Sequence, residues 1–113
     1  MYGRSDSTSG RAVYGSATAA SGTAYGGRFE SASTSGRGVF GFASASTGTN
    51  YGVMGQTNSG AGYGVYGTAP GAGTGVYGYS SSGYGGYFDT GSGTALYVEG
   101  TASVGVITIR GGA

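Results

Sequence analysis

A small residue followed by a short, mostly apolar stretch returns at regular intervals along this chain of 113 residues. We call this small residue the anchor, and the anchors are Ala12, Gly26, Gly38, Gly52, Gly64, Gly75, Gly85, Ala95 and Gly105. Their spacings are 14, 12, 14, 12, 11, 10, 10 and 10, so a 26-residue double unit gives way to a ten-residue unit. Such a period predicts a repeat architecture built from one supersecondary unit, rather than an irregular globular fold.

Ser-Gly or Thr-Gly pairs lie between the anchors, at residues 21–22, 35–36, 47–48, 59–60, 82–83 and 92–93. Each pair predicts a turn, because glycine adopts positive φ at little cost. Nearly all spacings are even, and side chains alternate faces of a strand with a period of two. Adding two residues therefore keeps the same face inward, whereas adding one would reverse it. We predict an all-β, elongated repeat fold of short strands joined by glycine turns.

The single odd spacing, 11, contains Pro70 within the stretch TAPGAGTG. Proline cannot donate a hydrogen bond to a strand ladder, so it belongs at an edge, a turn or a bulge. We therefore divide the chain into alternating 12- and 14-residue β repeats over 1–67, an irregular linker or bulge over 68–74, and ten-residue β repeats with a C-terminal strand over 75–113.

Two positions of the repeat exchange side-chain volume with each other. The position after the anchor, here the Val column, holds Val13, Gly27, Val39, Val53, Val65, Val76, Gly86, Leu96 and Val106. Two residues later, in the Gly column, glycine predominates, but Phe29 and Phe88 follow the two units whose Val column is glycine. Volume exchange is typical of interiors, so we predict that this strand face packs inward. Its expected packing residues are Val13, Val39, Val53, Val65, Val76, Phe29, Phe88 and Leu96.

The position between these two, the Tyr column, holds residues such as Tyr66 and Tyr77 but also accepts Arg28. A column that accepts arginine is less enclosed, so we expect Tyr66 and Tyr77 at a rim or subunit boundary, more exposed than Val65 and Val76. The residue before the anchor is often Tyr or Arg, as at Arg11 and Arg37. Strand parity places it on the inner face, and we expect the arginines to reach solvent from a strand end.

Three stretches match the G-x-G-x-x-G phosphate-binding pattern, at residues 36–41, 62–67 and 73–78. That pattern requires a helix directly after it and an acidic residue later in a strand–helix–strand unit. The chain has no helical periodicity, and its abundant glycine opposes helix formation. We therefore interpret these glycines as parts of turns and of close backbone contacts, and expect no nucleotide site and no cofactor.

Composition offers little for catalysis or for charged partners. There is no cysteine and no histidine, only four acidic residues, and serines without a His or Lys base to activate them. We expect no enzyme activity and no metal site. Five Lys or Arg residues against four acids make no basic groove, so we expect no nucleic-acid partner. No apolar run approaches the ~18 residues of a membrane helix, so no membrane insertion is expected.

The stretches YGVMGQTNSGAGYGVYG, at 51–67, and GVYGYSSSGYGGYFDTGSGTALYVEGTASVGV, at 75–106, resemble a known repeat type. They are similar to the Gly-Tyr-Val-Tyr-Gly repeats of bacterial and phage tail-fibre-like proteins. The resemblance covers nearly the whole chain, is specific for the repeat and weak for function, and carries no catalytic residues. It implies fibre formation, trimerisation and an extracellular, cell-surface or virion location.

The thin apolar content favours assembly with further copies. Ordering each residue costs roughly 1–2 kcal/mol of backbone entropy, and small folds with poor cores need staples or partners. We expect an intertwined homotrimeric β fibre acting as a shaft, spacer or filament subunit. The structural alternative is a monomeric β-solenoid of 26 residues per coil that stacks into filaments. We also expect a fragment of a longer chain, because the N-terminus MYGRSDSTSG reads as the second half of a unit.

Other classes remain as alternatives. An adhesin-type module would contact glycans or a cell-surface receptor through exposed Tyr and Arg, but the largest irregularity, GTAPGAGTG, contains no aromatic residue. An ice-binding solenoid would need a ladder of Thr-x-Thr, and only Thr47-x-Thr49 occurs. Disordered Tyr-Gly-Ser tracts would lack the Val column and its exchange with Phe.

The coupled exchange of Val and Gly for Gly and Phe predicts a cooperatively folded, β-rich species. Circular dichroism of the purified chain should give a β-type spectrum that melts in one transition. A random-coil spectrum together with collapsed amide-proton dispersion would contradict this prediction.

Overall fold

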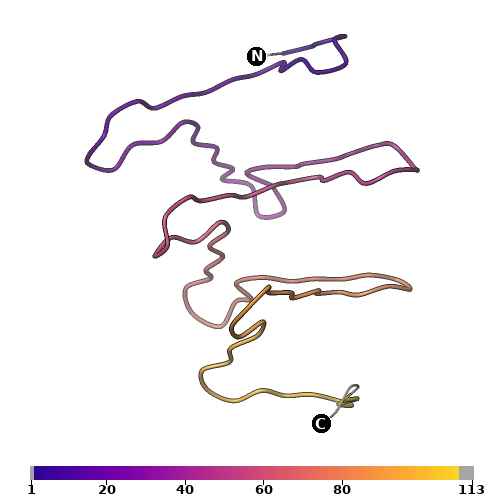
Figure 1. Ribbon diagram of the computed structural model, residues 1–113. Coiled ribbons are helices and arrows are strands. Elements are labelled where there is room, and N and C mark those ends of the chain that lie inside the picture. Colours follow the sequence, from indigo (N-terminus) through magenta and orange to yellow (C-terminus); the bar gives the residue numbers. More distant parts are fainter. Residues whose placement is uncertain (1, 110–113) are drawn as a thin grey trace. The chain divides into compact units, whose positions relative to one another are not determined.

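The computed structural model of the chain describes residues 2–109, and this part contains no helix and no strand. The chain falls into two units, Met1–Gly62 and Tyr63–Ala113, which we describe separately. Within each unit the trace is a succession of arms joined by sharp reversals (Figure 1). The predicted irregular segment, 68–74, lies inside the second unit.

Two series of direction changes organise this trace. The chain bends at every anchor, from Ala12 to Gly105. A second series lies between the anchors, at residues 7–9, 20–22, 33–35, 46–49, 60–61, 70–73, 81–83, 91–93 and 100. The six Ser-Gly or Thr-Gly pairs named above fall at or directly beside bends of this second series, but positive φ occurs at only three of their glycines, Gly22, Gly48 and Gly93. Each repeat is therefore a loop with a turn at its tip and a bend at its base.

In the first unit, one class of turn recurs every 26 residues and is closed by hydrogen bonds. The amides of Gly10, Gly36 and Gly62 donate to the carbonyl oxygens of Ser7, Ser33 and Ser59, at 3.3, 3.2 and 3.1 Å. In the first two of these turns the serine hydroxyl also accepts the amide two residues on, at 3.4 Å. Such side-chain to backbone bonds are how serine stabilises turns. The third turn has an equivalent bond from Ala61 to the hydroxyl of Ser59, at 3.3 Å.

A second class of turn alternates with the first and depends on left-handed glycine. Gly22 has a φ of 83° and Gly48 a φ of 80°, and these two residues are again 26 apart. A residue with a Cβ pays about 1–2 kcal/mol in this conformation. The 12- and 14-residue units of the double repeat therefore differ in the chemistry of their turns as well as in length.

The second unit relies mainly on the glycine class of turn. Positive φ occurs at Gly71, Gly93 and Gly100, while the Gly83 amide donates to the Ser80 hydroxyl at 2.9 Å. The bend at 70–73 begins at Pro70, the chain's single proline. An irregular turn was expected in this segment, and a turn is a site that accepts a residue without an amide proton.

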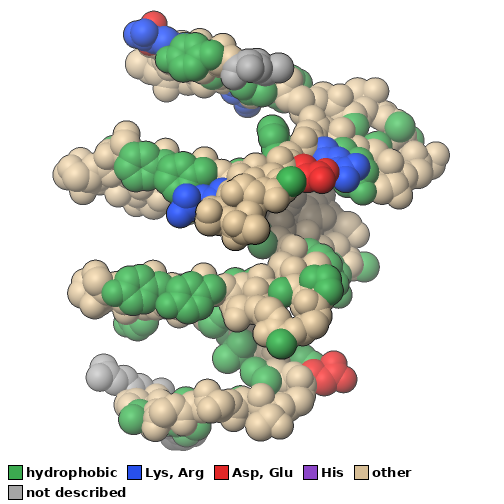
Figure 2. All heavy atoms as spheres, turned by 180° about the vertical axis from the view of Figure 1, so that it is seen from behind, with side chains coloured by type: hydrophobic (Ala, Val, Ile, Leu, Met, Phe, Trp, Pro, Cys, Tyr) green, Lys and Arg blue, Asp and Glu red, His purple; other side chains and the backbone are tan. Residues whose placement is uncertain are grey.

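No residue in the described range 2–109 is buried, and the large hydrophobic side chains are all exposed, from 51% at Val98 to 88% at Tyr2. Figure 2 shows hydrophobic side chains uncovered on the face that it presents. The accessible surface is 11166 Å², about twice the roughly 5,600 Å² expected of a compact protein of this mass. The described residues therefore form no core within a single copy of the chain.

The backbone is likewise open to partners. Within residues 2–109, three backbone–backbone hydrogen bonds are formed, all of them in the serine turns. A folded domain makes about one internal hydrogen bond per residue. A strand is defined by its ladder to a neighbouring backbone, so strands that form only between copies do not appear in one copy. The all-β fibre therefore stays a prediction, which a single copy does not test.

Two glycines in the turns offer a matched test of backbone geometry. A Cβ added to Gly48 or to Gly60 would meet no atom within 4 Å, but only Gly48 has positive φ. We predict that Gly48→Ala lowers the stability of the folded state by about 1–2 kcal/mol per chain, whereas Gly60→Ala is neutral or slightly stabilising. Melting temperatures at equal protein concentration measure both. Equal effects of the two substitutions would contradict the assignment of the left-handed turn.

Candidate assembly surface

The base of each loop is a close approach between two stretches of backbone. A Cβ added to Gly67 would lie 2.6 Å from the carbonyl oxygen of Gly75, the next anchor, and one added to Gly41 would meet the carbonyl oxygen of Gly52. A real Cβ does not fit at such distances, so glycine is required in the Gly column at these two positions. The same approach to the following anchor occurs at Gly15 and Gly78, where an added Cβ would meet the carbonyl oxygens of Gly26 and Gly85.

The Val column of the following unit completes the same contact. The added Cβ at Gly41 would lie 2.5 Å from Cγ2 of Val53, and at Gly67 it would lie 2.5 Å from Cγ2 of Val76. The valine methyl therefore occupies the space that the missing side chain leaves. This contact links the Gly column of one unit to the Val column of the next.

The two Gly-Gly-x-Phe units, at residues 26–29 and 85–88, fill their space differently. A Cβ added to Gly27 would lie 3.1 Å from Cε2 of the Phe29 ring, and one added to Gly86 would lie 3.0 Å from Cε2 of Phe88. Each ring thus folds back over the glycine two residues before it. The ring and the Val-column glycine are thus in contact within each unit, while a slot shared by the two columns in the assembled protein stays a prediction.

Side chains on either side of an anchor pair across its bend, three residues apart, and we call each such pair a clasp. The guanidinium carbon of Arg11 lies 5.9 Å from the Tyr14 ring centroid, and that of Arg37 lies 5.6 Å from the Phe40 centroid. The second unit uses two aromatic rings instead, with centroids 5.7 Å apart in both Tyr63–Tyr66 and Tyr84–Tyr87. Each clasp contributes about 0.5–1 kcal/mol when exposed and stiffens the bend that it crosses.

The clasps change the interpretation of the residue before the anchor. Strand parity placed Arg11 and Arg37 on the face of the Val column, but the structure pairs them with the Tyr column. The reason is the bend at the anchor, which breaks the alternation of a continuous strand. The signal was visible in the sequence, because Arg or Tyr before the anchor is matched by an aromatic residue three positions later in these four units.

The charged side chains form two local, exposed ion pairs. Arg4 Nε lies 2.9 Å from Asp6 Oδ1, and an Arg28 guanidinium nitrogen lies 3.3 Å from Glu30 Oε2. All four side chains are at least 69% exposed, so solvent screens both pairs and each contributes little. The residues from 2 to 109 hold no group of three or more acidic, His or Cys side chains suited to a metal. The described chain also has no helix of the length and apolarity needed to cross a bilayer.

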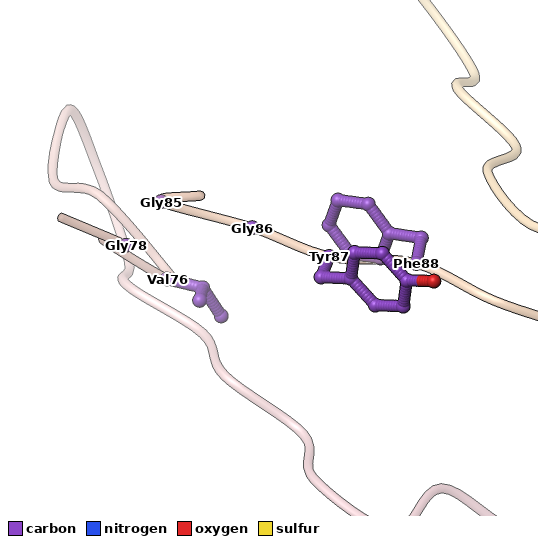
Figure 3. Close-up of a pocket in the computed structure, with 6 residues that line it drawn as sticks. All are labelled: Val76, Gly78, Gly85, Gly86, Tyr87 and Phe88. Atoms are coloured by element: carbon purple, nitrogen blue, oxygen red, sulfur yellow. The ribbon is translucent and has the colours of Figure 1, made fainter. Parts of the chain in front are cut away.

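One open pocket lies in the second unit and is lined by Val76, Gly78, Gly85, Gly86, Tyr87 and Phe88. Val76 and Gly78 come from one arm, and the other four residues come from the next (Figure 3). Apart from the tyrosine hydroxyl, the side chains around it are apolar, and the glycines contribute none. The pocket has the character of a packing site and offers no acid, base or cation.

The residues predicted to pack contact one another only in the ways just described. Single-chain exposure is high for all of them and differs little between columns, with Val65 at 71% and Tyr66 at 74%, and with Val76 at 73% and Tyr77 at 80%. The inward direction of the Val column in an assembly therefore stays a prediction. Phe42 was not among the predicted residues, and its ring stacks on that of Phe40 with centroids 6.1 Å apart.

Comparison of this chain with protein-family models, with curated proteins and with solved structures found no match.

The shared slot at Gly27 and Phe29 predicts a strong coupling between two substitutions. Gly27→Val alone should destabilise the folded state by about 1–3 kcal/mol, because its side chain meets the Phe29 ring. Phe29→Gly alone should also destabilise, because the ring contact is lost. The double variant restores the common Val-x-Gly form and should recover most of the loss caused by Gly27→Val. Melting temperatures of the two single variants and the double variant decide the question, and strict additivity would show that the columns do not touch.

Proposed function

We propose that this chain is a structural subunit of a fibre, acting as a shaft or spacer through self-assembly and without catalysis. The observation that carries the proposal is the complete exposure of its periodic apolar columns. Isolated exposed apolar residues are normal, but large contiguous apolar patches mark interaction sites. Here the exposed groups recur in every repeat, so the interaction surface extends along the chain.

The open backbone supports the same proposal. Among residues 2–109 the only backbone–backbone hydrogen bonds are those of the three serine turns, so most amide and carbonyl groups are free for a neighbouring chain. Peptide groups buried in an assembly must be paired, and strand addition between copies pairs them while it covers the apolar columns. Three chains pairing in this way would give the trimeric fibre expected from the sequence.

Pairing between chains accounts for these observations better than pairing between coils of one chain. A monomeric solenoid would join residues about 26 positions apart by backbone hydrogen bonds. In the described part of the chain each backbone hydrogen bond instead spans three residues. The 26-residue period of the turns then reflects the alternating shapes of successive loops. We further propose an extracellular, cell-surface or virion location, which the resemblance to tail-fibre-like repeats implies.

The solution mass of the purified chain tests the proposal directly. We predict a mass close to three times the 10.9 kDa of one chain, or a larger filament, by light scattering after size exclusion. The melting temperature should also rise with protein concentration, because association stabilises the folded state by mass action. The β-type circular dichroism signal should be lost together with the assembled mass on dilution.

A folded, β-rich monomer whose melting temperature is independent of concentration would contradict this proposal and favour the solenoid. As a control, the same measurements on Gly67→Val should give weaker association, because the valine would collide with the backbone of Gly75 at the loop base.

A further inference from the structure

We infer that each Gly-Gly-x-Phe unit forms an apolar socket that receives a side chain from a second copy of this chain and so fixes the register between copies. The inference rests on the proposed self-assembly and deepens it by naming the site that selects one alignment. Two observations carry it: the pocket at residues 76–88, and the absence of a valine methyl where other units have one.

The socket arises from a substitution in the repeat. At Gly41 and Gly67 the Cγ2 atom of the next Val column, Val53 or Val76, fills the space beside the glycine. At Gly78 the next Val-column residue is Gly86, and a Cβ added to Gly78 would meet only the backbone of Gly85. The methyl group is missing from this place, and the pocket is found there.

The Phe88 ring, which replaces the missing Val-column side chain in this unit, borders the socket and does not fill it. The Phe88 ring covers Gly86, which lies two residues earlier in the chain. It leaves the space next to Gly78 open. In Figure 3 Val76 lies on the other arm and Tyr87 beside Phe88, so apolar groups border the space between the two arms. The lining suits a side chain such as valine, leucine or a tyrosine ring, which are the side chains that the repeat displays.

A second copy is the occupant that the exposed area favours. The chain exposes 11166 Å², roughly 5,500 Å² more than a compact protein of its mass, whereas a stable interface needs only about 800 Å² per partner. A small free ligand would leave nearly all of this excess uncovered. A neighbouring copy would cover it and would bring an apolar side chain to the socket in the same step.

The spacing of the sockets gives them a role in alignment. Apart from the units at 26–29 and 85–88, each Val-column position carries a valine or leucine, so the remaining units are nearly interchangeable. The first of these two units repeats the arrangement, because a Cβ added to Gly15 would meet only the backbone of Gly26. A slip by one unit would place each socket opposite a different part of its neighbour, and both sockets would lose their occupants together.

Spin-label distance measurements test this inference. The chain has no cysteine, so Ser82→Cys in an exposed bend provides a single labelling site. In the assembled parent, pulsed electron resonance should give one narrow set of label–label distances. Adding Gly86→Val and Phe88→Gly gives this unit the common Val-x-Gly form and fills the socket. Several sets of label–label distances should then replace the single set, while the solution mass stays unchanged. Leu96→Val, which alters the Val column of the next unit but not the socket, should leave the distances narrow.

The outcomes of this experiment distinguish the socket proposal from the fibre proposal. An unchanged narrow distribution in the rewritten variant, at unchanged mass, would overturn the socket while the fibre proposal stands. Several distances in the parent would do the same. A monomeric parent would overturn both proposals and is recognised from the mass alone. If the rewritten variant does not assemble, Phe88→Leu, which shortens one wall, replaces it: extra distances support the socket, and an unchanged narrow set overturns it.

Discussion

The close contact of two backbone stretches at the loop bases formed by Gly15, Gly41, Gly67 and Gly78 is the constraint on which the rest of the structure depends. At Gly41 and Gly67 the next anchor's carbonyl oxygen and the next valine methyl occupy the place of a Cβ, so only glycine fits. A narrow base made of glycine contributes no side chain to an interior. The apolar groups therefore stand on the remaining positions, and in a single copy they are exposed. The proposed assembly would cover them while leaving the loop bases unchanged.

The proposed self-assembly would bring a risk of unspecific pairing that the repeat has to limit. Unpaired backbone edges with exposed apolar side chains are templates for indiscriminate pairing. In this chain the tips of the loops are polar and closed, by serine hydrogen bonds at Ser7 and Ser33 and by left-handed glycines at Gly22 and Gly48. The clasps hold the bends at the anchors. Turns and bends shaped within one chain limit the geometries in which two chains can meet.

The sequence predicted where the loops turn better than it predicted which side chains contact one another at the anchors. The positions of the turns could be predicted because serine and glycine both favour turns, but their two geometries, at Gly22 and Gly36, could not. The contact between Gly27 and Phe29 was foreshadowed by their exchange of volume over two residues. The pairing of Arg11 with Tyr14 was missed, because a period of two was assumed to continue through the anchor, where the chain in fact bends. Strands that form only between copies depend on the backbone of a second chain, so a pattern in one sequence could not place them.

A repeat of identical units would assemble without a unique alignment, because every slip by one period would restore the same contacts. The departures from the repeat are therefore where specificity has to be encoded. Loop-base glycines and turn residues are the parts whose geometry tolerates little change, and they set the common shape of each unit. The Val and Gly columns depart from it together at Phe29 and Phe88, where the Val-column residue is glycine and a ring covers that glycine. Under the proposed socket, shape and alignment would reside in different residues, so a unit could change its partner contacts while its fold is kept.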